Sequence, residues 1–206
     1  MTAERIEARL SIIISIFLLC AAWYQGQIAR QTLIDSLRPF LYVPGVHIVG
    51  GGPDGKGQYV IKINITNSGQ TQARKMITTD GLGTVQGFPP PEWEPPTDFD
   101  FKEVAKTFFD LVPPKEYAQV FIPIDTGFVS AIKAHTKTVI VYGTIRYCDI
   151  FKSVHMTRFC QKFEFWTLDA KHENQETFLF GPCGAAHSCD DNNCPDYDSH
   201  DNGACL

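Results

Sequence analysis

The sequence lacks the motifs by which common enzyme classes are recognised. It contains no phosphate-binding glycine loop, nucleophile elbow or paired-carboxylate motif, and the glycine-rich residues 50–57 follow none of these patterns. An excess of basic residues is also missing, since 18 Lys and Arg are outnumbered by 23 Asp and Glu. A nucleic-acid-binding protein normally carries a basic surface. We therefore expect a non-enzymatic protein that uses no cofactor and binds no nucleic acid, and no small-molecule substrate is indicated.

Long apolar runs are absent except near the N-terminus. Leu10–Tyr24 contains no charge, follows Arg5 and Arg9, and ends in an aromatic pair suited to a membrane interface. The run is shorter than the roughly 20 residues that usually span a bilayer. The small residues after Cys20 also fit a cleaved signal peptide, and a buried helix of a soluble domain is a third interpretation. We expect Leu10–Tyr24 to contact the lipid bilayer as a membrane anchor.

The chain after this run favours a retained anchor over a cleaved leader. No break separates the run from Gln27–Leu37, and Arg38-Pro39 predicts the end of one long helix. Residues 1–38 would then form the anchor and a juxtamembrane helix. Basic residues are balanced, with two before the run and two after it, so the positive-inside rule says little about orientation. The short N-terminal arm favours an internal N-terminus and an external domain.

Residues 39–180 carry the alternation of apolar and polar side chains that predicts β-strands. The clearest case places Tyr59, Ile61, Ile63 and Ile65 on one face. Pro44 marks its own strand as an edge or bent strand. Further strand-like segments are Phe40–Val49, Ala73–Thr79 and Ala118–Pro123. We expect a mainly β fold, an antiparallel β-sandwich preceded by one transmembrane helix.

An insertion at about residues 81–110 interrupts this pattern. Gly87–Pro96 contains five prolines and is expected to be extended and stiff. Asp98–Asp110 predicts a short helix with an apolar side. The Pro-rich part is interpreted as a rigid surface crossing, with a partner-binding segment as the alternative.

The segment Thr138–Phe165 predicts a β-hairpin at the centre of the domain. Its turn spans Asp149–Ser153, and a turn centred on Phe151 pairs positions whose numbers sum to 302. Phe159 then lies opposite Gly143, an arrangement that stabilises sheets. The odd-numbered face of the hairpin is predicted to be the core face.

This register tests the polar and cysteine residues of the hairpin. His155 and Cys160 would point to opposite faces, so a Cys/His nucleophilic pair is rejected. Cys148 and Cys160 lie six rungs apart, roughly 20 Å at the strand rise, which is too far for a disulfide between them. We interpret His155 as a hydrogen-bonded hairpin residue, and the alternative is a functional polar group near Asp149 and Tyr147.

The C-terminal tail, residues 181–206, is rich in Cys and Asp and contains no Lys or Arg after Cys183. It is too polar to build its own core. Its cysteines predict disulfides in an oxidising compartment. A metal site and a reduced thiol tail are the alternatives, although the spacings match no usual zinc pattern. The candidate metal ligands are Cys183, His187, Cys189, Cys194, His200 and Cys205.

Three motifs carry a resemblance to a known group of proteins. These are an N-x-G-x-T-x-A turn at Asn67–Ala73, the run Val141–Phe151 continued by His155–Cys160, and the helix exit Arg38-Pro39-Phe40. Over roughly residues 10–165 the chain resembles uncharacterised bacterial membrane-anchored proteins with an immunoglobulin-like β-sandwich. The resemblance implies a β-sandwich on a membrane helix and no specific activity. Cys148, the Pro-rich insertion and the Cys-rich tail depart from it.

The leading hypothesis is a single-pass protein of the bacterial inner membrane with its domain in the periplasm. It would have an interaction or scaffolding role with a protein partner. The edge strand Val43–Val49 and the Pro-rich loop are the expected contact surfaces. The alternative is a metal-binding or thiol-redox module that uses the tail, and a hydrolase with an unrecognised site is a third hypothesis.

Overall fold

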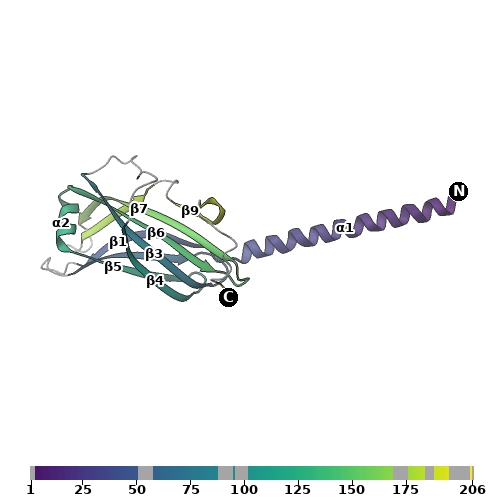
Figure 1. Ribbon diagram of the computed structural model, residues 1–206, viewed down its shortest axis with the longest axis horizontal. Coiled ribbons are helices and arrows are strands. Elements are labelled where there is room, and N and C mark those ends of the chain that lie inside the picture. The colour runs from purple at the N-terminus through teal and green to yellow at the C-terminus, as the bar shows by residue number, and fades with distance from the viewer. Residues whose placement is uncertain are drawn as a thin grey trace. The chain divides into compact units, whose positions relative to one another are not determined.

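The computed structural model describes residues 3–50, 58–87, 95, 102–168, 176–183, 188–194 and 205. The chain forms two compact units, residues 1–38 and residues 39–206. The first unit contains a single long helix, and the second contains two antiparallel β-sheets (Figure 1).

Helix α1 spans Ala3–Leu37 and includes the apolar run. Its segment Ser11–Leu37 is long and apolar enough to cross a membrane. These 27 residues measure about 40 Å at the helical rise, against roughly 30 Å of bilayer hydrocarbon. Large apolar side chains are exposed, with Phe17 and Leu19 each 71% accessible. A helix with exposed apolar residues suits a lipid environment better than the interior of a soluble domain. The helix ends one residue before Arg38-Pro39, as predicted.

The smaller sheet contains β1, Leu41–Gly50, β2, Tyr59–Asn67, and β5, Tyr117–Ile124, in the order β1-β2-β5. Alternate residues of β2 are buried, which confirms the predicted half-buried strand. The pairing of β1 with β2 shifts register between Tyr42 and Gly45. Pro44 lies in this irregularity, where its missing N–H breaks no regular ladder bond.

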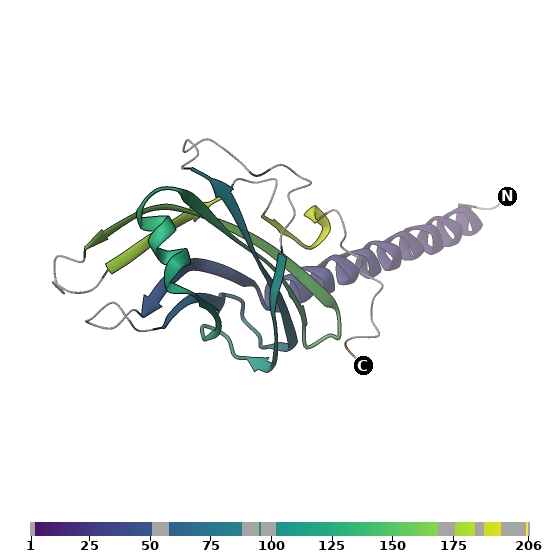
Figure 2. The same cartoon turned by 60° about the vertical axis from the view of Figure 1, so that its left-hand side comes forward.

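The larger sheet has the order β4-β3-β6-β7-β8, with β9 paired to β7. Figures 1 and 2 show the long strands of this sheet and the short helix α2, Thr126–Lys133, at one end of the domain. Its strands are β3, Ala73–Gln86, β4, Lys102–Val112, β6, Lys137–Cys148, β7, Val154–Leu168, β8, Glu176–Pro182, and β9, Cys189–Asp190.

One hydrophobic core lies between the two sheets. Ile61, Ile63 and Ile65 contribute from the smaller sheet, and the odd-numbered residues of β6 contribute from the larger one. Helix α2 adds Val129 and Ile132 to this core. Its first turn is capped by Asp125, whose carboxylate accepts a hydrogen bond from the Phe128 N–H at 2.7 Å.

The turn at Asn67 joins three parts of the domain. The buried Asn67 side chain donates to the carbonyls of Thr71 and Val112, at 2.8 and 3.0 Å. Its carbonyl oxygen accepts from the N–H groups of Phe40 and Gly69, at 3.3 and 3.0 Å. A buried amide with its hydrogen bonds satisfied specifies one arrangement of the backbone segments around it.

The predicted hairpin register is confirmed. Tyr142 pairs with Cys160 and Cys148 with Val154, so each pair of positions sums to 302. Gly143 pairs with Phe159, whose ring covers the glycine. Val139, Val141, Ile145 and Tyr147 lie in the core, which confirms the odd-numbered face as the core face.

We predict that Gly143→Ala destabilises the domain by about 1–3 kcal/mol, as expected for overpacking. A Cβ at this position would overlap the Phe159 ring and lie 2.7 Å from the Asp80 carboxylate. Urea unfolding of the full chain would measure the change. Gly45→Ala is the control, because its Cβ would meet only the exposed His47 side chain, and we expect a change below about 0.5 kcal/mol. Equal stabilities of the two variants would contradict this account.

The helix predicted at Asp98–Asp110 is wrong, because Lys102–Val112 forms strand β4. This strand pairs with β3, and cross-strand hydrogen bonding overrides the local helical spacing. Residues 81–86, which were assigned to the insertion, extend β3. Most of the Pro-rich segment lies outside the described residues.

Candidate functional site

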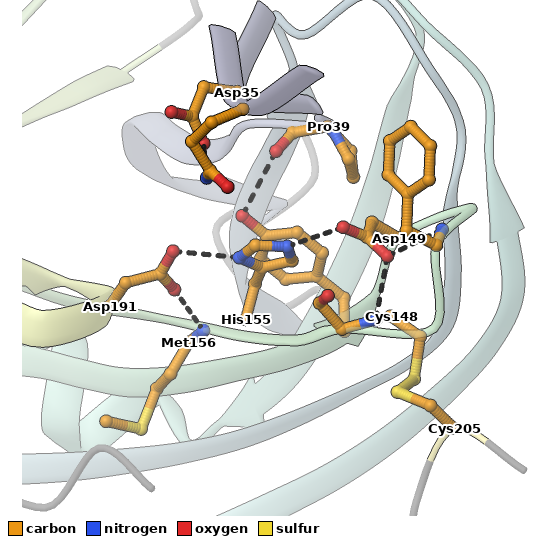
Figure 3. A network of polar contacts seen from close by, with 12 residues as sticks. Asp35, Pro39, Cys148, Asp149, His155, Met156, Asp191 and Cys205 are labelled. Carbon is orange, nitrogen blue, oxygen red and sulfur yellow. Dashed lines mark hydrogen bonds and ion pairs between the residues drawn. A yellow bond between two sulfur atoms is a disulfide. The ribbon is translucent and has the colours of Figure 1, made fainter. Parts of the chain in front are cut away.

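A buried histidine lies between two carboxylates at the turn end of the β6–β7 hairpin. His155 Nδ1 is 2.8 Å from Asp191 Oδ2, and His155 Nε2 is 3.1 Å from Asp149 Oδ2 (Figure 3). All three residues are buried. A neutral imidazole has only one N–H, so two carboxylate partners select the doubly protonated imidazolium. We call these three residues the His155 cluster.

The electrostatics agree with this geometry. Burial by itself disfavours the charged imidazolium, but the hydrogen bonds and negative charges of Asp149 and Asp191 outweigh it. They raise the pKa of His155 to about 9. Burial raises the pKa of Asp149, but hydrogen bonds from His155 and from the turn backbone lower it overall. These shifts favour a protonated His155 and an ionised Asp149 at neutral pH.

Asp149 also holds the hairpin turn. Its Oδ1 accepts hydrogen bonds from the backbone N–H groups of Phe151 and Ser153, both at 2.8 Å. Aspartate favours turns because its short side chain reaches the backbone two residues ahead. One carboxylate therefore fixes the turn with one oxygen and orients His155 with the other.

Asp191 brings the C-terminal tail to the sheet. It begins the short helix η2, Asp191–Asn193, and its Oδ1 accepts from the Met156 N–H at 2.9 Å. The preceding strand β9 pairs with β7 at Thr157 and Arg158. The Thr157 hydroxyl donates to the Leu41 carbonyl at 3.0 Å and lies 3.2 Å from the Asp190 carboxylate. These polar contacts attach the C-terminal tail, which is too polar to form a core of its own, to strand β7.

Tyr147 forms one wall of the cluster. Its ring stacks on His155 with centroids 5.3 Å apart, and its hydroxyl donates to the Pro39 carbonyl at 3.4 Å. Burial, together with the negative charges of Asp191 and Asp190, raises the pKa of Tyr147. The phenol therefore stays neutral and joins the beginning of the domain to the cluster.

Two disulfides, Cys148–Cys205 and Cys160–Cys183, join the tail to β6 and β7, and a third, Cys189–Cys194, closes a loop within the tail. The seventh cysteine, Cys20 in α1, is free. Cys160–Cys183 packs with Ile140 in a small cluster separate from the main core. Neither Cys148 nor Cys160 pairs with the other, in agreement with their predicted separation.

The disulfides determine which of the predicted metal ligands are available. The four candidate cysteines, Cys183, Cys189, Cys194 and Cys205, are all disulfide-bonded and present no thiolate. His187 and His200 lie outside the described residues. Within the part of the chain that the structure describes, no group of three or more His, Cys, Asp or Glu side chains could hold a metal ion.

A second buried charge lies in the core near the middle of the larger sheet. Asp80 of β3 pairs with Gly143 and is fully buried, and neither of its oxygens has a hydrogen-bond partner among the described residues. Burial raises the pKa of Asp80 to about 6, and the nearby Thr78 hydroxyl, which does not reach hydrogen-bonding geometry, opposes the rise. An unpaired buried carboxylate destabilises a fold when it is ionised.

The prediction that His155 is hydrogen-bonded within the hairpin is confirmed by its contact with Asp149, and Tyr147 lies beside it. Asp191 was not predicted, because no pattern distinguishes it from the other four Asp residues of the tail. Asp80 was also missed. It shares the parity of the buried residues Met76 and Thr78, and this signal would have placed it in the core.

The polar atoms of the His155 cluster are hydrogen-bonded to one another and to the backbone. Both ring nitrogens are occupied, and the partner carboxylates are bonded to backbone N–H groups as well. A general base or metal ligand needs a free ring nitrogen. The arrangement instead fastens the tail to the hairpin.

Comparison of the chain with protein-family models finds no match, and comparison with curated proteins finds no similar sequence.

Proposed function

We propose that the chain is a single-pass membrane protein that displays an immunoglobulin-like β-sandwich in the periplasm of a bacterium. Its role is non-enzymatic: it supports interaction or scaffolding in the cell envelope. The observation that carries this proposal is the combination of an exposed apolar helix with a domain that contains three disulfides. Disulfides persist in the periplasm and are rare in the cytosol.

The polar interior supports a structural role. The carboxylates of Asp149 and Asp191 are bonded to His155 and to the backbone, and Asn67 is bonded to four backbone groups. Such bonding stabilises one arrangement of the domain. The Asn67 turn and the hairpin are also the segments that carry the resemblance to membrane-anchored immunoglobulin-like domains.

A membrane-impermeant maleimide tests the topology. It would be applied to intact and to lysed cells, with and without a reductant, using Cys20→Ser so that only the six domain cysteines are counted. We expect labelling after reduction that needs no lysis, because oxidised external cysteines become available when they are reduced. Labelling without reduction, and only after lysis, would place the domain in the cytoplasm and overturn the proposal.

A thiol-redox module is the second candidate function, and one observation favours it. The Cys189–Cys194 disulfide closes a short loop that contains both Asp190 and Asp191. Reduction by a dithiol reductant would open this loop and release two contacts of the tail with β7. Selective labelling of Cys189 and Cys194 at mild reductant, with the other four cysteines protected, would support this candidate over a purely structural tail.

A further inference from the structure

The outer face of the smaller sheet carries a shallow groove. It lies on the side away from the core, because the alternate residues Ile61, Ile63 and Ile65 of β2 are buried. All three strands of the sheet, β1, β2 and β5, can be followed in Figure 2. The groove is lined by Pro44, Lys62, Asn64, Thr66, Tyr117 and Gln119.

A pair of amides forms the middle of this groove. Gln119 Nε2 donates to Asn64 Oδ1 at 3.0 Å, which fixes both side chains across the β2–β5 pair. The Asn64 amide N–H groups and the Gln119 carbonyl oxygen then have no partner among the described residues. Donors and an acceptor held side by side suit a ligand rich in hydroxyl groups, because each hydroxyl both donates and accepts.

The strands of this face carry a lysine and no carboxylate. Strands β1, β2 and β5 contain no Asp or Glu, although the protein has a net charge of −5. Lys62 pairs across the sheet with His47 and Phe121, and it has no ion-pair partner among the residues described. A cation without a neighbouring carboxylate favours an anionic ligand by charge complementarity.

Two exposed aromatic rings complete the face. Tyr117 and Phe121 are 65% and 53% exposed. They lie four residues apart on the same side of β5, roughly 13 Å at the strand rise. A sugar ring has an apolar C–H face and a hydroxyl-bearing edge, so a chain of such rings matches aromatic rings that flank a pair of amides.

We propose that this groove binds an acidic oligosaccharide, a chain of sugar rings that carry carboxylate groups. The rings stack on Tyr117 and Phe121, the hydroxyls bond to Asn64 and Gln119, and a carboxylate pairs with Lys62. The inference rests on the proposed function, since a domain displayed in the envelope would meet such polymers. An acidic peptide fits less well, because extended peptides usually bind along a strand edge through main-chain hydrogen bonds.

Isothermal titration calorimetry of the full chain tests this binding. The detergent should be zwitterionic, since a maltoside headgroup would itself present sugar rings. The probes are hexagalacturonic acid, its methyl ester, which keeps the rings but removes the charge, and hexaglutamate. We expect the acid to bind with a submillimolar Kd. The ester should bind at least about tenfold more weakly than the acid, as for loss of one charge-assisted hydrogen bond. Lys62→Gln should weaken binding of the acid by a similar factor, and so should Phe121→Ala.

Matched controls lie on strand β4 of the other sheet. Lys106 sits over the exposed ring of Phe108, so Lys106→Gln and Phe108→Ala remove the same side-chain types from a different face. We expect both to bind hexagalacturonic acid as the wild type does. No binding at millimolar acid, equal losses in the β4 variants, or tighter binding of hexaglutamate would each overturn the inference. Self-association abolished by Tyr117→Ala, without binding of the acid, would overturn it as well.

The calorimetric titration and the maleimide experiment test the two proposals independently. If the domain labels as periplasmic but does not bind the acid, the display function stands and the oligosaccharide proposal fails. If the domain binds the acid but labels as cytoplasmic, the proposal of periplasmic display fails instead.

Discussion

His155→Gln should destabilise the domain by about 3 kcal/mol at pH 7, because it leaves the buried carboxylates of Asp149 and Asp191 without their shared cation. Thermal unfolding of the full chain, followed by near-ultraviolet circular dichroism in a zwitterionic detergent, measures the loss. A second substitution, Asp191→Asn, should recover part of it, because the amide oxygen can still accept from the Met156 N–H while one negative charge is removed.

The pH dependence separates this charge effect from a packing defect. The pKa of His155 is about 9 in the folded state, above its ordinary value of 6.5. Its contribution is therefore complete below pH 6.5 and is lost as the pH rises through 9, by about 3 kcal/mol in total. Variants that lack His155 should not show this alkaline loss.

His47→Gln is the matched control, because this histidine is exposed on the outer face of β1. We expect a change below about 0.5 kcal/mol and an alkaline loss like that of the wild type. A His155→Gln variant that kept the wild-type pH profile would show that His155 is neutral, and it would contradict the ion cluster.

Asp80→Asn should stabilise the domain by about 3 kcal/mol at pH 7.5. The pKa of Asp80 is raised by burial to about 6 in the folded state, from an ordinary value of 3.8. For a carboxylate with a raised pKa, the destabilisation is absent below pH 3.8, grows between pH 3.8 and 6, and is complete above pH 6. Asparagine has a similar shape and no charge, so the same unfolding measurement should show a gain that disappears below pH 4.

Asp110→Asn serves as the comparison, since Asp110 is an exposed carboxylate on the neighbouring strand β4. Its change should stay below about 0.5 kcal/mol at either pH. A destabilised Asp80→Asn variant at pH 7.5 would mean that the Asp80 carboxylate has a partner that contributes to the fold.

The two buried charges act in the same direction. The His155 cluster loses stability as the pH rises through 9, and ionised Asp80 destabilises the fold above about pH 6. The wild-type domain should therefore be more stable in mildly acid than in alkaline solution. Asp149, whose pKa is lowered, limits the stability of the domain at acid pH, because its contribution is lost in strong acid.

Local patterns were sufficient for several elements. Alternation along Thr138–Phe165, with a turn at Asp149, predicted the hairpin, its register and its core face, because side-chain parity and turn position together allow few alternatives. Arg38-Pro39 predicted the end of α1, since a residue before proline avoids helical geometry. Strand β4 was missed because its apolar residues also match a helical spacing, and only pairing with β3 decides between the two.

The sequence by itself determined the apolar helix, the alternating strands and the face of the hairpin that enters the core, all of which follow from residues near one another in the chain. Tertiary structure alone decided the three disulfide pairings, the meeting of Asp191 with His155 across 36 residues, and the burial of Asp80 opposite Gly143. The physical reason is the distance along the chain over which each kind of interaction acts. Dihedral and side-chain periodicities act over a few residues, whereas a disulfide or a buried charge depends on which distant segments the packed sheets bring into contact.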